Sequence, residues 1–109
     1  MQKCWLILGK LYYHYEVTDF LEPVTLELFG DDQKLYEEYC SIVTEPMDIS
    51  TIMAKMRADE YPSKHAFRRD VQLIFDNCRE FNEEGTEIYH CANSLNVYFT
   101  GLWHEFGMY

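Results

Sequence analysis

The chain is organised around the segment SKHAFRRDVQLIFDNCREF, residues 63–81. Its apolar side chains recur at alternating steps of four and three residues, which is the spacing of one face of an α-helix. These side chains are Phe67, Val71, Ile74, Cys78 and Phe81. Ser63 precedes the pattern and is a typical N-cap residue. The segment therefore predicts a long helix whose apolar face lies in a core.

The residues that follow, 82–86, are predicted to form a corner. Asn82 and Gly85 both tolerate the left-handed backbone on which helices often end. Thr86 then stands where it can cap another helix, predicted over residues 87–106. The buried side of that helix is assigned to Ile88, Cys91 or Ala92, Leu95, Tyr98 or Phe99, Leu102 and Phe106.

The N-terminal part of the chain, residues 2–17, is also predicted to be helical. Its apolar stripe consists of Cys4, Leu8, Leu11 and Tyr15, widened by Ile7 and Tyr12. Gly9 is the one weak position, because glycine lowers helix stability.

A long connection is predicted between this first helix and the next one, over residues 18–47. Pro23 disfavours helix before it, and a short helical piece is expected from Lys34 to Tyr39. The connection carries many apolar side chains, so we expect it to fold back onto the bundle. Asp48 is a good N-cap for a short helix over residues 48–58.

The segments together predict an all-α fold. The chain has 109 residues and is 48% hydrophobic, which suits one folded domain, residues 1–109, with a single core. No alternating apolar run predicts a strand. We expect an antiparallel four-helix bundle with a long connection between helices one and two, and the pattern leaves its handedness open.

The negative charge is confined to two connecting regions. The net charge is −10, of which residues 27–48 contribute −6 and residues 76–87 contribute −4. This sign disfavours direct binding to a nucleic-acid backbone and favours a basic partner. The alternative is that the acidic loops only keep the protein in solution.

The chain carries no pattern of a membrane or secreted protein. No apolar run approaches the roughly 20 residues that cross a bilayer, and the N-terminus lacks a signal-peptide cleavage site. The four cysteines are widely spaced and are expected to be buried free thiols in a reducing compartment. A zinc site at Cys78, His90 and Cys91 is the alternative, although the spacing fits no standard ligand pattern.

Enzymatic activity is not expected. Nucleophile elbows, phosphate-binding glycine loops and paired zinc-ligand motifs are all absent, and we expect no cofactor and no metal. A binding site remains, at the end of the bundle where the long connection meets the corner. Its apolar walls would be Phe20, Val24, Phe81 and Ile88, with the amide of Asn82 at its base.

Several separated motifs resemble the bromodomain signature in order and spacing. They are YCSIVTEPMDISTI at residues 39–52, Tyr61-Pro62-Ser63, Phe67, Asp70, Phe75, and NCREFN at residues 77–82. Bromodomains are left-handed four-helix bundles that bind acetyl-lysine, chiefly on histone tails. The resemblance thus implies the handedness, a reader of acetylated histone or other basic tails, a role in chromatin and transcription regulation, and a location in the nucleus.

The resemblance also implies which residues bind acetyl-lysine. Asn82 matches the asparagine whose amide donates to the acetyl carbonyl, and Tyr39 matches the tyrosine that reaches this carbonyl through a water. The residues that match the walls are Phe20, Val24, Cys78, Phe81 and, as gatekeeper, Ile88.

Two departures from the family pattern bear on the ligand. Thr18-Asp19 replaces the usual Trp-Pro, so the aromatic shelf outside the pocket is missing. The connection is longer than in compact members, which leaves open which of Leu28, Leu35 or Tyr36 lines the pocket. The alternative function is a bromodomain-shaped scaffold that binds protein partners with weak or no recognition of acetyl-lysine. In either case we expect a monomeric domain, within a larger chromatin complex.

Overall fold

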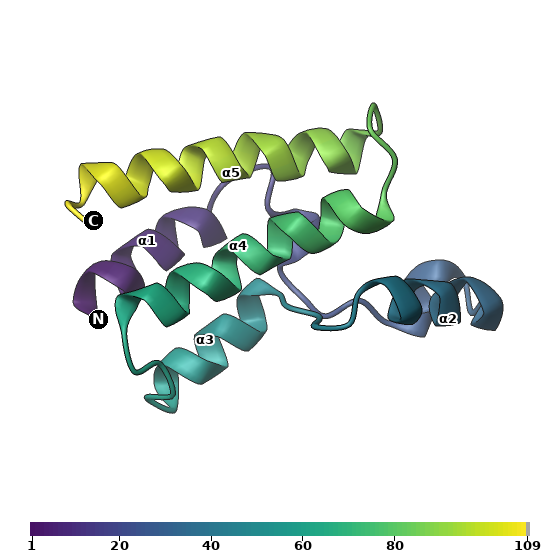
Figure 1. Ribbon diagram of the computed structural model, residues 1–109, viewed down its shortest axis with the longest axis horizontal. Coiled ribbons are helices and arrows are strands. Elements are labelled where there is room, and N and C mark those ends of the chain that lie inside the picture. The colour runs from purple at the N-terminus through teal and green to yellow at the C-terminus, as the bar shows by residue number, and fades with distance from the viewer. Residues whose placement is uncertain (109) are drawn as a thin grey trace.

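The computed structural model describes residues 1–108, and over this range the chain is helical without strands. The α-helices are α1 (Gln2–Tyr12), α2 (Gln33–Ile42), α3 (Ile49–Arg57), α4 (Lys64–Phe81) and α5 (Glu87–Glu105). Two short 3-10 helices, η1 (Thr18–Phe20) and η2 (Leu26–Phe29), lie in the connection between α1 and α3. Helices α1, α3, α4 and α5 form a bundle, and α2 projects from one end of it (Figure 1). The predicted all-α bundle is confirmed.

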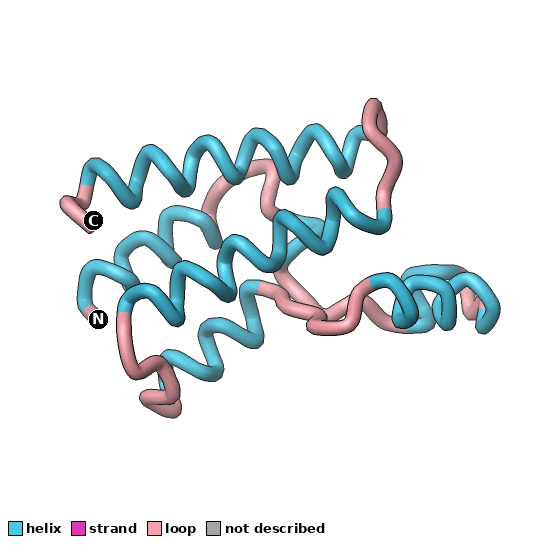
Figure 2. The backbone as a smooth tube through the Cα atoms, in the orientation of Figure 1, coloured by secondary structure: helices cyan, strands magenta, loops and turns pink. Residues whose placement is uncertain are grey.

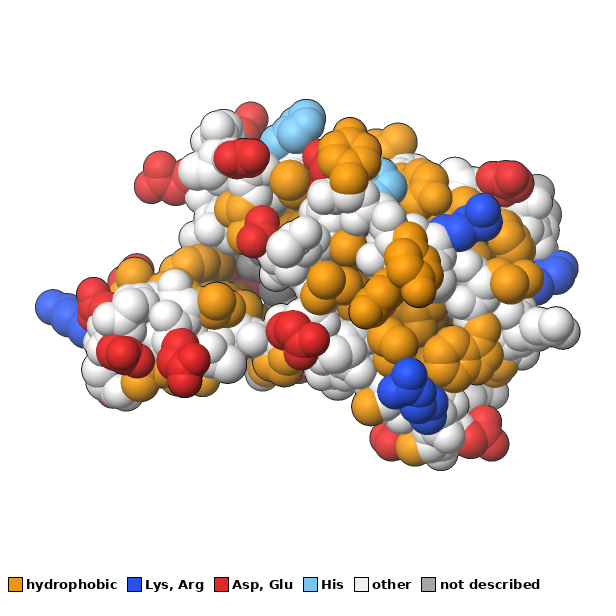
Figure 3. All heavy atoms as spheres, turned by 180° about the vertical axis from the view of Figure 1, so that it is seen from behind, with side chains coloured by type: hydrophobic (Ala, Val, Ile, Leu, Met, Phe, Trp, Pro, Cys, Tyr) orange, Lys and Arg blue, Asp and Glu red, His pale blue; other side chains and the backbone are white. Residues whose placement is uncertain are grey.

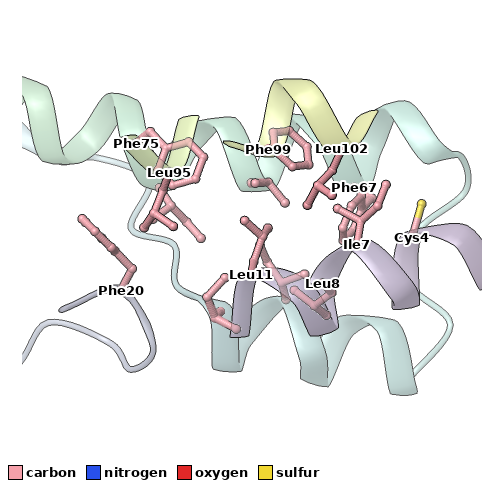
Figure 4. Packing of buried hydrophobic residues seen from close by; sticks show 14 of the residues in the cluster. Cys4, Ile7, Leu8, Leu11, Phe20, Phe67, Phe75, Leu95, Phe99 and Leu102 are labelled. Atoms are coloured by element: carbon pink, nitrogen blue, oxygen red, sulfur yellow. The ribbon is translucent and has the colours of Figure 1, made fainter. Parts of the chain in front are cut away.

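The core lies between α1, α4 and α5, with α3 closing it from the side. Helix α4 packs along α5, and α1 packs against both α5 and α3. Figure 4 shows side chains from these helices meeting in the interior. The buried rings include Phe67, Phe75, Phe99 and Trp103. Phe20 of η1 closes one end of the core, with its ring edge-on to Phe75 at 6.3 Å between centroids.

Two of the predicted N-caps are present as hydrogen bonds. The Asp48 carboxylate accepts from the backbone N–H of Thr51 at 3.0 Å, and the Ser63 hydroxyl accepts from the N–H of Ala66 at 3.3 Å. Thr86 occupies the N-cap position of α5 without capping it through its side chain. Its hydroxyl instead donates to the Glu83 carbonyl at 2.7 Å.

The first helix is shorter than predicted. It ends at Tyr12, not at residue 17, and the chain turns back through His14, whose Nδ1 accepts from the N–H of Glu16 at 3.1 Å. The aromatic and β-branched residues after Tyr12 have low helix propensity, and this local hydrogen bond competes with the helical ladder. Tyr15 is therefore 85% exposed and not part of the buried stripe.

The long connection only partly folds back onto the bundle. Its helical piece is confirmed and extends over α2, which packs on η2 and touches α4. The two form an arm at one end of the molecule, joined to the bundle by loops (Figure 2). Leu28 on this arm is 68% exposed. The prediction that the apolar residues of the connection pack onto the bundle is therefore wrong for this part of it.

A buried polar cluster ties the α3–α4 turn to α4. The Asp70 carboxylate, which is buried, accepts from Lys55 Nζ and from the Tyr61 hydroxyl, each at 2.6 Å. Burial and the hydrogen bond to Asp70 raise the pKa of Tyr61, so its hydroxyl stays protonated and keeps donating.

No helix of residues 1–108 has the length and apolar character that a membrane span requires.

Replacing two of the glycines by alanine should change the stability of the protein in opposite directions. A Cβ added at Gly9 would meet no atom within 4 Å, so Gly9→Ala should raise the free energy of unfolding by about 0.5–1 kcal/mol, because alanine favours helix. Gly85 has φ of +94°, where an L side chain is strained. Gly85→Ala should lower that free energy by about 1–2 kcal/mol. Urea denaturation measures both, and equal effects of the same sign would contradict this assignment.

Candidate functional site

A small cavity lies where the connection between α1 and α3 meets the end of α4 and the start of α5. Its volume is about 60 Å³. Because one water needs roughly 10–15 Å³ on this scale, the cavity admits a group of a few heavy atoms. The residues that line it are Asp19, Phe20, Glu22, Val24, Tyr39, Met47, Ile74, Asn77, Cys78, Asn82 and Ile88.

Phe81 is the one predicted site residue that does not line the cavity. Its ring instead packs edge-on against Tyr39 at 5.0 Å and against Phe29 at 5.9 Å between centroids. Cys78 and Asn82 are one helical turn apart and share the face that meets the cavity, whereas Phe81 turns toward the arm. The Phe81 ring thus packs against the ring of Tyr39 and supports its position.

The other predicted site residues do meet at the cavity. They are Phe20, Val24, Tyr39, Cys78, Asn82 and Ile88. None of Leu28, Leu35 or Tyr36 lines it; of the arm formed by η2 and α2, the lining includes Tyr39.

Sequence reasoning missed five lining residues, Asp19, Glu22, Met47, Ile74 and Asn77. Ile74 could have been found, because it stands one helical turn before Cys78 on the same face. Asn77 could not have been found in this way, since its position in the lining depends on a partner that is distant in the sequence. Its amide donates to the Glu45 carbonyl at 2.8 Å and so ties the connection to α4.

The side chain of Asn82 is held in one orientation. Its Nδ2 donates to the Cys78 carbonyl at 3.0 Å. A flipped amide would set Oδ1 against that carbonyl oxygen, which is two acceptors face to face. One N–H of Nδ2 is thereby committed. Nδ2 also lies 3.6 Å from Cys78 Sγ, a weak acceptor, and a carbonyl oxygen in the cavity would be a stronger partner for the second N–H.

The backbone of Asn82 differs from the predicted left-handed cap. It is extended, with φ of −93° and ψ of 148°. Its backbone N–H also donates to the Cys78 carbonyl, at 2.9 Å. The last turn of α4 is therefore satisfied without a left-handed residue, and only Gly85 in the corner takes positive φ.

Tyr39 brings a hydroxyl to the cavity from α2. Its half-buried ring packs against Phe29 and Phe81, and the hydroxyl makes no hydrogen bond within residues 1–108. Burial, with smaller contributions from neighbouring groups such as Cys40, raises the pKa of Tyr39. The group therefore stays a neutral hydroxyl, able to donate to or accept from a water.

Cys78 contributes an uncharged wall. Its thiol donates to the Ile88 carbonyl at 3.5 Å, and burial raises its pKa to about 11. At neutral pH the sulfur is a small apolar group and not a nucleophile. Within the described chain, no group of three His, Cys, Asp or Glu side chains is placed to hold a metal ion.

The mouth of the cavity is acidic. Asp19 and Glu22 line it from the side of η1, and the exposed side chains of Glu83, Glu84 and Glu87 follow Asn82 along the corner. An apolar interior with a negative rim attracts a cationic chain but does not accept a bare ammonium group, because burying an unpaired charge is costly.

Comparison with known proteins identifies relatives of this chain. The family model described as Bromodomain matches residues 4–94. The chain is 38% identical over 102 residues to "Bromodomain adjacent to zinc finger domain protein 2B" of Gallus gallus and 36% identical over 100 residues to the Homo sapiens protein of that name, covering 94% and 92% of this chain. It is 34% identical to "Bromodomain-containing factor 1" of Candida albicans over 97 residues, 89% of this chain. The matched regions are 4%, 4% and 12% of these relatives' lengths.

The raised pKa of Cys78 predicts slow alkylation. The prediction that the cysteines are buried is wrong for Cys40, which is exposed on the projecting helix α2. At pH 7.5 only about one thiol in three thousand would be ionised at Cys78, so iodoacetamide should modify Cys40 and spare Cys78. In a Cys40→Ser variant, the rate at Cys78 should rise about tenfold for each pH unit up to 11, because the thiolate is the reactive form. Peptide mapping by mass spectrometry measures both sites, and equal rates at neutral pH would refute the assignment.

Proposed function

This chain belongs to the bromodomain family, and from that premise we propose that it binds an acetylated lysine side chain in a basic peptide. Residues 1–109 would act as one such domain, reading acetylated histone or other basic tails in chromatin, in the nucleus. The observation that carries the proposal is the amide of Asn82, held by the Cys78 carbonyl at 3.0 Å beside a small apolar cavity. The role is binding and not catalysis.

The cavity suits the acetylated form of lysine better than the unmodified form. A lysine ammonium brings three donors, no acceptor and a charge that is costly to bury. Acetylation removes the charge and supplies a carbonyl acceptor. The second N–H of Asn82 would pair with that carbonyl directly, and the Tyr39 hydroxyl would reach it through a water.

The held orientation of Asn82 is central to this discrimination. A freely rotating amide could turn its oxygen toward a cation and bind the unmodified ammonium. The hydrogen bond to the Cys78 carbonyl disfavours that rotation. The apolar walls formed by Phe20, Val24 and Ile88 also contribute, because they would bury the alkyl stem of the ligand without offering it a polar partner.

The affinity for a single mark should be modest. Burying roughly 150 Å² of the ligand stem contributes about 3–4 kcal/mol at about 25 cal/mol per Å². One direct and one water-mediated hydrogen bond add on the order of 1–2 kcal/mol, and the loss of translational and rotational freedom cancels much of the sum. We therefore expect a Kd that is roughly micromolar or weaker.

Removing the amide donor should abolish preference for the acetylated form. In Asn82→Asp a carboxylate replaces the donor, so affinity for an acetylated tail peptide should fall about tenfold or more, because the acetyl carbonyl loses its partner. Calorimetric titration of the acetylated and unmodified peptide measures the change. Equal binding of both peptides by the native chain would favour the alternative function, a scaffold for protein partners.

Two tyrosines on α2 supply a matched pair of variants. Tyr39→Phe should weaken binding about threefold to fivefold through loss of the water-mediated contact, while Tyr36→Phe, whose ring stays outside the cavity, should leave it unchanged. The same titration tests both. An equal loss in the two variants would mean that the hydroxyl at the cavity has no special role.

Asp19 should set a preference for cationic residues beside the acetyl-lysine. Thr18-Asp19 stands where many family members carry the Trp-Pro of the aromatic shelf, and its second residue brings a carboxylate to the cavity. Asp19→Asn should weaken binding of a peptide with arginine next to acetyl-lysine about twofold to threefold, and less at high salt. The affinity for a peptide with glutamine in place of that arginine should be the same in Asp19→Asn as in the native chain.

Asp59→Asn is the control for this charge change, because Asp59 lies in the turn after α3, outside the cavity. It removes the same charge. Should both substitutions weaken the arginine peptide equally, net charge and not the position of Asp19 would explain the effect.

A further inference from the structure

A second hollow lies on the outer face of α1, on a different part of the chain from the cavity. We call it the α1–α3 groove; its volume is about 230 Å³. The residues that line it are Trp5, Leu8, Gly9, Tyr12, Tyr13 and Met53. Apolar side chains gather over α1 and α3 in the view from behind, with Lys and Arg and also some Asp and Glu side chains at the margins (Figure 3).

Helix α1 is apolar on both its faces. One face is buried in the core through Cys4, Ile7, Leu8 and Leu11. The opposite face leaves Trp5 38%, Leu6 53% and Tyr12 41% exposed, and Tyr13 beyond its end 84% exposed. Contiguous exposed apolar surface of this kind marks an interaction site in a soluble domain.

Gly9 forms part of the floor of the groove at a cost to helix stability. It lies one turn after Trp5 and one turn before Tyr13, so the three positions share a face. Nothing inside the protein requires a glycine there, because an added Cβ would meet no atom within 4 Å. The absent side chain leaves room for a partner to approach the helix backbone.

The charge on the two helices of the groove is opposite in sign to that of the whole protein, although Asp59 and Glu60 follow directly after α3. Neither α1 nor α3 contains an acidic residue, although the chain has 19 acidic against nine basic side chains. The basic residues of the two helices are Lys3, Lys10, Lys55 and Arg57.

Two of these cations are available to a partner. Lys55 is paired with Asp70, and Lys3 donates to the Phe106 carbonyl. Lys10 and Arg57 make no ion pair within residues 1–108. Lys10 adjoins Gly9, and Arg57 lies one turn after Met53 on the same face of α3.

We propose that the α1–α3 groove binds an acidic amphipathic helix of a partner protein. Apolar side chains of the partner at helical spacing would enter between Trp5, Tyr13 and Met53, and its carboxylates would pair with Lys10 and Arg57. A second copy of this chain fits less well, because a symmetric contact would bring the same cations together. The proposal does not depend on recognition of acetyl-lysine.

The test uses a designed helical peptide with leucine and phenylalanine on one face and glutamate on both flanks. It is titrated into the ¹⁵N-labelled chain and followed by NMR. We expect shifts confined to amides of α1 and α3, and a lysine-flanked peptide of the same apolar sequence should bind at least tenfold more weakly. Equal binding of both peptides, or shifts at the cavity around Asn82, would overturn the proposal.

Charge reversals separate the groove from general electrostatics. Lys10→Glu and Arg57→Glu should each weaken the glutamate peptide about threefold to tenfold. Lys34→Glu on α2 makes the same change in net charge and should leave the affinity within about twofold. An equal loss in all three variants would overturn the proposal.

Gly9→Ala and the oligomeric state complete the test. Gly9→Ala should weaken peptide binding while leaving the fold intact by circular dichroism, because its methyl group projects into the groove. Sedimentation should show a monomer over the titration range. A concentration-dependent dimer that Tyr13→Ser dissociates would assign the groove to a second copy and so overturn the choice of partner.

Discussion

A single backbone carbonyl, that of Cys78, is the acceptor on which the candidate site depends. It accepts from the backbone N–H of Asn82 at 2.9 Å and from the side-chain Nδ2 at 3.0 Å. The first bond completes the last turn of α4. The second holds the amide so that its other N–H has only the weakly accepting Cys78 sulfur, 3.6 Å from Nδ2, as a partner within the protein. The end of the helix and the orientation of the binding group are thus one structural feature.

The opposite side of the cavity comes from the connection between α1 and α3, which hydrogen bonds and ring contacts hold against the bundle. Asn77 donates to the Glu45 carbonyl at 2.8 Å, and the backbone N–H of Ser50 donates to the Leu21 carbonyl at 2.9 Å. Farther out, the rings of Phe29, Tyr39 and Phe81 pack together. These contacts set the distance between Tyr39 and α4, so the width of the cavity depends on the connection as much as on the bundle.

Charge distinguishes the two proposed binding sites. The cavity has Asp19 and Glu22 at its mouth and lies beside the acidic corner. The α1–α3 groove has only cations on its two helices. A basic tail and an acidic helix would therefore be directed to different parts of the surface, and the small domain could hold both at once.

Local chemistry and periodicity determined the helices of the bundle. The spacing from Phe67 to Phe81, the caps at Asp48 and Ser63, and the residue types of the family motif were all readable in the sequence, because each depends on neighbours within one or two helical turns. The same reasoning extended the first helix too far, since the competing hydrogen bond between His14 and Glu16 is not visible in apolar spacing.

Only the tertiary structure decided which side chains meet at the cavity. Phe81 packs against Tyr39 and not into the cavity, whereas Met47 and Asn77 line the cavity. Leu28 stays exposed to solvent. Each of these positions depends on how the long connection packs against α4. The sequence predicted Asn82 as the binding group, whereas the fixed orientation of its amide required the Cys78 carbonyl in three dimensions. A side chain's type is encoded locally, but its direction is set by the partners that folding brings to it.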